Sequence, residues 1–253
     1  MNERIFIAAG GVGSRLLTSE LPKCMLQIPI YQSTETEMVL KRTLRLLNTD
    51  IPITFLTGYG EEQVKETFPG YDYFRTLNVD KPGGILTAID KVLRNYKQDS
   101  YIFILSDVIW SKEALEHAIN TRHKKPITLY HDFRKAFSET YMITIHGNGI
   151  SIVNGIFSSL TIPSLAFEKQ GTEHYPPRSQ TPMREARIGH LDQLLRDQYK
   201  DYQTVIHQIA AVEDIDTDGQ YENLSLCVKL GVFDEPAKGK EWLNLKNKEV
   251  KDE

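Results

Sequence analysis

Short, mostly apolar runs stand out in the first half of the chain, and each run stops at a glycine or at a serine–aspartate pair. The runs are Ile5–Ala9, Ile53–Thr57 and Tyr101–Leu105, and they are followed by Gly10, Gly58 and Ser106-Asp107. Runs of this length without a regular polar alternation are typical of strands that are buried on both faces. The pattern therefore predicts the centre of a parallel sheet.

Helical spacing fills the intervals between these runs. The predicted helices are Glu61–Phe68, Ile85–Tyr96 and Lys112–Arg122. Ser111 has the small polar side chain of an N-cap and stands immediately before the third helix. Strand and helix thus alternate over residues 1–125, which is the signature of a parallel α/β sheet.

A further helix is predicted from a capping motif. Thr34 and Glu37 have the Thr-x-x-Glu spacing of a capping box, in which each side chain accepts a hydrogen bond from the backbone of the other residue. Apolar residues at helical spacing then form an inward-facing stripe, namely Met38, Leu40, Leu44 and Leu47.

The pattern changes after residue 125, where short strands predominate. They are predicted at Ile127–His131, Tyr141–Ile145, Ile150–Val153 and Thr204–Val212, with Gly147–Gly149 as a hairpin turn. Residues 170–185 combine prolines with polar residues, which predicts a long loop, whereas residues 188–199 have helical spacing. The last fifteen residues are rich in lysine and glutamate and are expected to end in a frayed tail.

We expect a single domain over residues 1–253, because the chain holds no internal repeat, low-complexity tract or clean linker. The expected fold class is α/β, with a mostly parallel, Rossmann-like central sheet flanked by helices. Residues 126–205 would form a β-rich portion in the second half. Residues 206–253 would add a return strand and a C-terminal helix or tail.

Composition narrows the class of protein without selecting a function. Hydrophobic residues make up 40% and charged residues 25%, which is the balance of an ordinary globular domain. The formal net charge of −4 provides no basic surface for nucleic acid or for an anionic membrane. Two cysteines, Cys24 and Cys227, exclude a disulfide scaffold, and no apolar run is long enough for a signal-peptide core or a membrane span. We therefore expect a soluble, cytoplasmic protein.

The strongest chemical signal is the segment Ala8-Ala9-Gly10-Gly11-Val12-Gly13-Ser14-Arg15, which Pro22-Lys23 follows. Here a buried strand ends in a glycine-rich turn whose backbone amides can approach phosphates. Arg15 and Lys23 flank the turn at a spacing able to clamp a polyphosphate, and Lys23 is expected to be exposed in a loop. A P-loop lysine and the third glycine of a dinucleotide motif are both absent. A tight turn with surface cations is the alternative interpretation.

These residues resemble the N-terminal signature of the nucleotidyltransferases, of the sugar-1-phosphate nucleotidylyltransferase and small cytidylyltransferase type. The resemblance implies that a nucleoside triphosphate binds the backbone of Ala8, Ala9, Gly10, Gly11 and Gly13. It also implies that Arg15 and Lys23 are catalytic, because they would neutralise the phosphates as pyrophosphate leaves. Related enzymes read the base in a segment that corresponds here to Gly83, Gly84 and Thr87, although two glycines at a helix start are also ordinary turn chemistry.

The same resemblance implies a Mg²⁺ site made by two distant aspartates. Asp107 ends the third apolar run, at the sheet edge where open α/β folds bind ligands, and Ser106 replaces the glycine that the family usually has there. Asp216 matches the second metal ligand, and Asp214 would share its face in extended chain and stays an alternative. Two structural interpretations are the alternatives to a metal site. Asp107 could cap a helix, and the segment around Asp216 could be an acidic turn before a helix that begins near Tyr221.

The resemblance therefore implies an enzyme that transfers a nucleoside monophosphate to a small phosphorylated acceptor and releases pyrophosphate. Residues 1–125 would be its nucleotide-binding half, and the β-rich residues 126–205 would bind the acceptor. CTP is the favoured donor, because the modest length resembles that of small cytidylyltransferases, and polysaccharide precursor biosynthesis is the implied setting. The first alternative is a glycosyltransferase of related fold that uses a nucleotide sugar. Such an enzyme requires Asp-x-Asp at the end of the third strand, and Ser106-Asp107-Val108 at that place counts against it. A non-catalytic nucleotide-binding regulatory subunit is the other alternative. The acceptor and the base stay open, and aromatic residues in the second half leave room for a homodimer interface.

Overall fold

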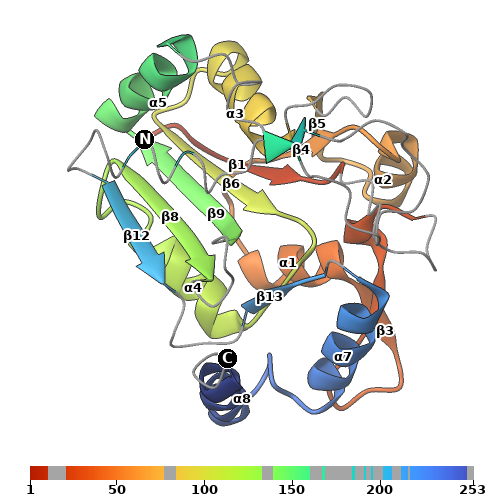
Figure 1. Cartoon of the computed structure of the whole chain (residues 1–253). Coiled ribbons are helices and arrows are strands. Elements are labelled where there is room, and N and C mark those ends of the chain that lie inside the picture. The colour runs from red at the N-terminus through yellow and green to blue at the C-terminus, as the bar shows by residue number, and fades with distance from the viewer. Residues whose placement is uncertain are drawn as a thin grey trace.

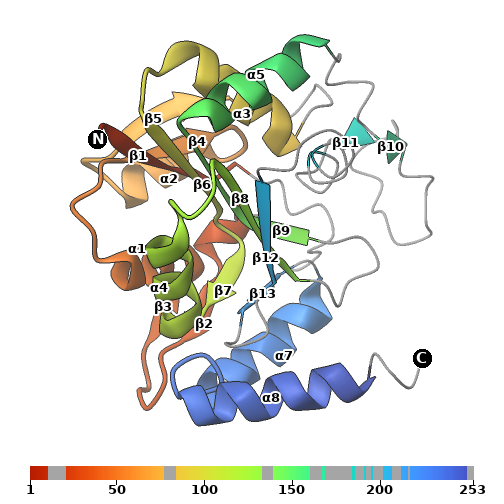
Figure 2. The same cartoon turned by 90° about the vertical axis from the view of Figure 1, so that its left-hand side faces the viewer.

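A seven-stranded sheet forms the centre of the protein, and helices cover both of its faces (Figures 1 and 2). The computed structural model describes residues 1–10, 21–76, 84–132, 139–159, 167–168, 184–185, 191, 195, 202–206, 212–215 and 217–249.

The strands of the central sheet are mostly parallel. Their order is β12 (Tyr202–Ile206), β8 (Ile127–Asp132), β9 (Glu139–His146), β6 (Ser100–Leu105), β1 (Glu3–Ala8), β4 (Ile53–Thr57) and β5 (Asp72–Arg75). Within this described sheet β9 alone runs antiparallel to its neighbours. The prediction of a mostly parallel α/β sheet is confirmed.

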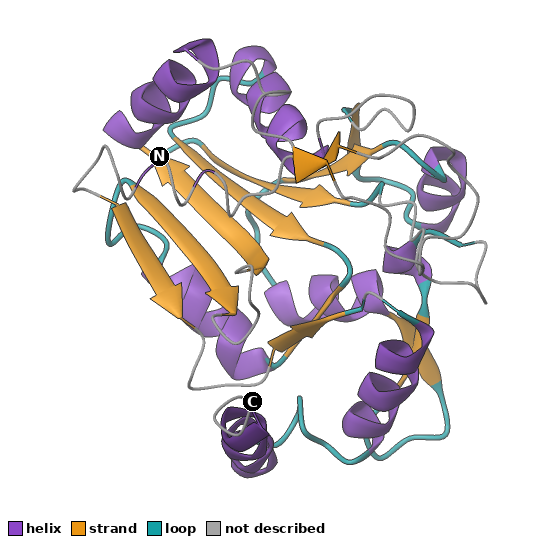
Figure 3. Ribbon diagram, in the orientation of Figure 1, coloured by secondary structure: helices purple, strands orange, loops and turns teal. Residues whose placement is uncertain are grey.

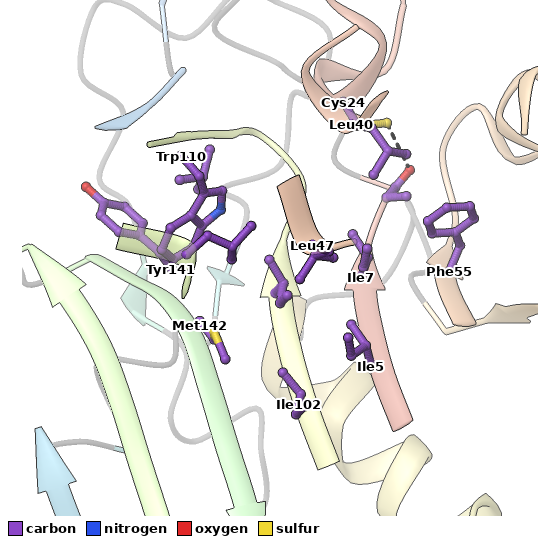
Figure 4. Close-up of a cluster of buried hydrophobic side chains, with 14 of the residues drawn as sticks. Ile5, Ile7, Cys24, Leu40, Leu47, Phe55, Ile102, Trp110, Tyr141 and Met142 are labelled. Carbon is purple, nitrogen blue, oxygen red and sulfur yellow. Dashed lines mark hydrogen bonds between the residues drawn. The ribbon is translucent and has the colours of Figure 1, made fainter. Parts of the chain in front are cut away.

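Alternating residues of the central strands enter two different cores, which explains their continuous apolar character. Ile5 and Ile7 of β1 belong to one core together with Ile102 of β6, as Figure 4 shows. Phe6 and Phe103 point to the other core, where their rings lie 5.3 Å apart. A strand with both faces covered can hold no polar alternation.

Seven helices are described in full, and each is assigned to a face by the core it enters. Their bounds are α1 (Val39–Leu47), α2 (Glu61–Thr67), α3 (Gly84–Asn95), α4 (Lys112–Thr121), α5 (Asn148–Ser159), α7 (Asp218–Lys229) and α8 (Pro236–Glu249). Helices α1, α2 and α4 pack on one face of the sheet, and α3 and α5 pack on the other.

Short strands and a third core extend the molecule beyond one end of the sheet (Figure 3). The pairs there are β2 (Gln27–Pro29) with β3 (Thr36–Met38) and β7 (Val108–Trp110) with β13 (Val212–Asp214). A further pair, β10 (Phe167–Glu168) with β11 (Arg184–Glu185), lies away from α7 and α8 (Figure 2). The third core lies between β2, β7 and α7. Both Figure 1 and Figure 2 place α7 and α8 on this side of the molecule.

A buried arginine joins these parts. Arg42 of α1 is 1% exposed, and its Nε donates to the carbonyl of Trp110 in β7 at 3.2 Å. Its Nη2 donates to the carbonyl of Phe233 at 3.2 Å and to Asp234 Oδ1 at 2.9 Å. One side chain therefore ties α1 to the strand that follows β6 and to the segment between α7 and α8.

Most predictions for the first half are confirmed. The apolar runs form β1, β4 and β6, and the three predicted helices are α2, α3 and α4 within one or two residues of their predicted ends. The Ser111 hydroxyl accepts a hydrogen bond from the backbone of Ala114 at 3.2 Å, so Ser111 caps α4 as expected.

The capping box predicted at Thr34 and Glu37 is wrong. Residues 36–38 are strand β3, and α1 begins at Val39 without a side-chain cap. Pairing with β2 satisfies the backbone of this segment, and Glu37 instead binds Arg45, with Oε1 2.6 Å from Nη2. Long-range pairing therefore replaces the local cap.

The strand predicted at Ile150–Val153 and the turn before it are also wrong. Residues 148–159 form helix α5. Ile150, Val153 and Phe157 recur at helical spacing and pack in the second core with α3. Burial of one helical face overrides the strand preference of β-branched residues.

Other predictions for the second half have mixed outcomes. The strand expected over 204–212 is two strands, β12 and β13, which lie in different sheets. The expected C-terminal helix is α8, which reaches Glu249 with Leu243 buried, whereas residues 250–253, where the chain is expected to fray, lie outside the described residues. Residues 170–183 lie outside the described residues, while Arg184–Glu185 is a strand rather than loop. Of the helix expected over 188–199, Leu191 and Leu195 are described, and both are helical and buried.

No helix in the described part of the chain is long and apolar enough to cross a membrane.

We expect Arg42→Met to lower the free energy of unfolding by about 3 kcal/mol, because it removes three hydrogen bonds of a buried side chain and leaves their polar partners behind. Urea denaturation followed by circular dichroism measures the change. Arg94→Met is the control, since Arg94 pairs with Asp90 on the surface of α3 and its loss should cost less than about 1 kcal/mol. Equal effects of the two substitutions would contradict the anchoring role of Arg42.

Candidate functional site

The carboxyl ends of β1 and β6 define the candidate site. The two strands pair in parallel, with Ala8 opposite Leu105, so the segments that follow them start side by side. From β1 the sheet grows toward β4 and β5 on one side, and the chain then returns to place β6 on the other side. Such a switch point is where open α/β sheets bind ligands.

Opposite charges meet at this edge. Asp107 follows β6, and its Oδ2 lies 3.2 Å from Nζ of Lys23, which stands 84 positions earlier. Lys23 is only 8% exposed, and the side chain of Asp107 is 27% exposed. The expectation that Lys23 lies exposed in a loop is therefore wrong: Lys23–Met25 forms a buried 3₁₀ turn whose lysine points to the end of β6.

Two side chains hold the start of the glycine-rich segment. The Ser106 hydroxyl donates to the carbonyl of Ala8, and the thiol of Cys24 donates to the carbonyl of Ala9 at 3.8 Å (Figure 4). Burial and the nearby charge of Asp107 raise the pKa of the Cys24 thiol to about 12. Cys24 is therefore a neutral donor here, and it pins Lys23 to the end of β1.

Pro22 is held from the opposite side by α2. Gly60 precedes α2 with a φ of +66°, and a Cβ on it would lie 2.3 Å from Cγ of Pro22. Close approach of Pro22 to this backbone thus requires a glycine. The Pro22 carbonyl accepts from the backbone of Met25 at 2.8 Å, so this contact also positions the turn that carries Lys23.

A late segment of the chain reaches the same edge. Strand β13 pairs antiparallel with β7, with Asp214 opposite Val108. The backbone N–H of Ile215 then donates to the carbonyl of Asp107 at 3.0 Å. The prediction that the segment around 216 approaches Asp107 thus has a backbone contact in its favour, although Asp216 itself lies outside the described residues.

The remaining predicted residues are placed as follows. Ala8 ends β1, and the backbone N–H of Ala9 donates to the carbonyl of Leu56 at 2.9 Å, which continues the sheet; Gly10 is the next residue. Gly84 is the first residue of α3 and Thr87 is half-buried in its first turn. Gly11, Gly13, Arg15 and Gly83 lie outside the described residues.

Sequence reasoning missed the positions that hold the site in place. The sequence marks Ser106 only as a replacement for the glycine that the resembling family usually has, and it predicts no role for Cys24 or Gly60. A polar residue directly after a buried strand is the one local signal for Ser106. For Cys24 and Gly60 the chain offers no local signal, because their partners are distant in sequence.

Asp107 is the described group best suited to a metal ion. Its carboxylate is the type of ligand that Mg²⁺ and Mn²⁺ prefer, and it stands at the sheet edge. Within the described part of the chain, no group of three or more histidine, cysteine or acidic residues could hold a metal.

Comparison with known proteins relates the chain to others by fold. No protein-family model matches it, and no curated protein matches it. Among solved structures, the inositol-1-phosphate CTP transferase from T. maritima is similar with a TM-score of 0.59 and 13% identity, over 90% of this chain and 96% of that chain.

Two other solved structures were determined with ligands. HddC from Yersinia pseudotuberculosis, complexed with GMP-PN, has a TM-score of 0.54 and 13% identity, over 90% of this chain and all of that chain. Rv0371C from Mycobacterium tuberculosis H37Rv, complexed with manganese, has a TM-score of 0.53 and 12% identity, over 89% of this chain and 98% of that chain. The mostly parallel α/β fold is shared with these proteins.

We expect Cys24 to react with N-ethylmaleimide at pH 8 at least about a hundredfold more slowly than Cys227. With its pKa raised to about 12, Cys24 is a thiolate in only about one molecule in ten thousand at this pH, and it is buried, whereas Cys227 is half-buried. Mass spectrometry of labelled peptides measures both rates. Comparable rates in the folded protein would show that the segment is not pinned.

We expect Gly60→Ala to lower the free energy of unfolding by about 2–4 kcal/mol, since the new Cβ meets Pro22 and the residue keeps a positive φ. Gly70→Ala is the matched control, because Gly70 has a φ of +91° with no atom within 4 Å and pays only for the backbone, about 1–2 kcal/mol. The displaced Pro22 should also speed the labelling of Cys24. If both variants were equally stable, the contact between Gly60 and Pro22 would be unimportant.

Proposed function

We propose that the protein is a metal-dependent nucleotidyltransferase, which transfers a nucleoside monophosphate from a triphosphate to a small phosphate monoester. The observation that carries this proposal is the pair of Lys23 and Asp107, held 3.2 Å apart at the edge where β1 and β6 end. A triphosphate bound with a divalent cation needs a cation for its oxygens and a carboxylate for the metal. Both groups are placed beside the start of the glycine-rich segment.

The phosphate side of the proposed site begins at Gly10. The Ala9 amide belongs to the sheet, so the amides proposed to face phosphate are those that follow it, including Gly11 and Gly13. Lys23 and Arg15 are the proposed phosphate-binding cations. The Ser106 and Cys24 hydrogen bonds support this assignment, because they hold the start of the segment, at Ala8 and Ala9, near Asp107.

The metal side is proposed to consist of Asp107 and Asp216. Asp216 follows Ile215 directly, and Ile215 is bonded to the carbonyl of Asp107. Asp214, which lies opposite Val108 in β13, is the alternative ligand. Mg²⁺ is the proposed cation, and the manganese complex of Rv0371C supports a divalent metal on this fold. When bound, such a cation polarises the α-phosphate and offsets charge on the departing pyrophosphate.

The reaction needs positioning and neutralisation of charge more than covalent help from the protein. An oxygen of the acceptor phosphate attacks the α-phosphorus, and the bond from that phosphorus to the oxygen bridging to the β-phosphate breaks. The electron pair leaves with pyrophosphate. Lys23, close to the end of β1, would donate to the phosphate oxygens on which this charge develops.

CTP is the proposed donor, with Gly83, Gly84 and Thr87 as residues of the base pocket. The similarity of fold to a CTP transferase supports this choice, while the GMP-PN complex of HddC indicates that the fold accepts more than one base. The proposed acceptor is a small phosphorylated alcohol, such as a sugar or polyol phosphate.

Pyrophosphate release tests the proposal. The purified chain is incubated with Mg²⁺, each of the four ribonucleoside triphosphates or dTTP, and a panel of sugar, polyol and amino-alcohol phosphates. Pyrophosphate should appear only when triphosphate and acceptor are both present. Release of free nucleoside diphosphate from nucleotide sugars, without pyrophosphate from any triphosphate, would favour a glycosyltransferase instead.

We expect Asp107→Asn to reduce turnover by about a hundredfold or more, which corresponds to about 2.7 kcal/mol, and high Mg²⁺ should restore it only in part. The midpoint of thermal unfolding should stay within about 3 °C, because the asparagine oxygen still accepts from Lys23. Asp90→Asn on α3 is the control and should turn over normally. A normal rate for Asp107→Asn would remove the metal role of this residue.

A further inference from the structure

The ammonium group of Lys23 stands against the same carboxylate that the proposed function gives to a metal ion. Its Nζ is 3.2 Å from Asp107 Oδ2, and the two side chains are 10% and 27% exposed. We propose that Lys23 is an internal counterion, which excludes free divalent cations from Asp107 until a triphosphate arrives. The substrate of the site is then the metal–triphosphate complex. This inference rests on the proposed function, whose metal position it uses.

Charge is the reason for the exclusion. A divalent cation that binds Asp107 while Lys23 remains in place sets three positive charges around one carboxylate that is largely shielded from water. Moving the Lys23 ammonium away from Asp107 breaks an ion pair between two partly buried side chains, which costs free energy. Free metal therefore competes against an ion pair that is already formed.

A triphosphate removes both penalties. Its oxygens offer Lys23 a new anionic partner close to the end of β1, and its own bound cation then replaces the ammonium at Asp107. Each charge keeps a partner throughout the exchange. The two ligands are thereby coupled, so that the triphosphate raises the affinity for metal and the metal raises the affinity for triphosphate.

The backbone around Lys23 is held in place, so that its ammonium group can change partners without a movement of the main chain. Cys24 and Met25 are buried, the thiol of Cys24 is bonded to Ala9, and Pro22 is packed against Gly60. The Cα of Lys23 is thus held, whereas its four-carbon stem can rotate. Only the ammonium needs to move from Asp107 toward phosphate.

Binding of Mn²⁺ alone, without nucleotide, tests the inference, with the free ion measured by electron paramagnetic resonance. Lys23→Met and Lys23→Gln should bind Mn²⁺ about tenfold more tightly than the wild-type chain. Lys23→Arg keeps the charge and should bind as weakly as wild type. Lys238→Ala is a matched control, because Lys238 also pairs with a carboxylate, its Nζ lying 3.0 Å from Oε1 of Glu235. This pair is distant in sequence from Lys23 and Asp107. Lys238→Ala should leave Mn²⁺ affinity unchanged.

The double variant Lys23→Met with Asp107→Asn identifies the carboxylate. It should lose the whole gain in Mn²⁺ affinity, since that gain requires Asp107. Circular dichroism of each variant establishes that it is folded, and the two neutral variants provide independent measurements if one of them unfolds. A gain that persists in the double variant would place the released metal site elsewhere and overturn the inference.

Failure of the inference and failure of the proposed function give different results. If the Lys23 variants bind Mn²⁺ no more tightly than wild type, while wild type releases pyrophosphate and Asp107→Asn does not, the counterion role is wrong and the proposed function stands. If wild type releases no pyrophosphate, and Asp107→Asn changes Mn²⁺ binding neither in the wild-type chain nor in Lys23→Met, both the counterion role and the proposed function are overturned.

Discussion

The parallel pairing of β1 with β6 is the constraint on which the candidate site depends. Because Ala8 lies opposite Leu105, both strands end at one edge, and the glycine-rich segment starts beside Asp107. The hydroxyl of Ser106 reinforces this junction by donating to the carbonyl of Ala8. Apolar burial on both faces keeps the two strands in register, since a shift by one residue would exchange the side chains of the two cores. The position of Asp107 beside the glycine-rich segment thus depends on the packing of the two cores against the sheet.

A second set of contacts reaches the site from outside the sheet. Arg42 holds the carbonyl of Trp110, and thereby fixes β7 against α1. Strand β13 pairs with β7, and this pairing delivers Ile215 to the carbonyl of Asp107. A buried charge in α1 is therefore connected, through two short strands, to the segment that precedes Asp216. Arg42 therefore contributes both to the stability of the third core and to the geometry of the proposed metal position.

Local patterns predicted the elements whose environment is uniform along their length. The apolar runs became β1, β4 and β6 because strands covered on both faces favour apolar residues throughout, and Ser111 caps α4 because capping is a local interaction. The same reasoning failed where a distant partner was available. Residues 36–38 pair with β2 instead of forming a capping box, and Ile150–Val153 lies in a helix because its apolar face packs against α3.

The kind of sheet and the two positions of interest at its edge, Lys23 and Asp107, could be predicted from the amino-acid sequence, since strand ends and glycine-rich turns are local features. Three contacts could not: the partly buried ion pair of these two side chains, the neutral donor that Cys24 supplies to Ala9, and the space that Gly60 leaves for Pro22. Each of these contacts joins segments that are far apart in the chain. Burial and charge pairing arise only when such segments meet, so no local pattern carries them.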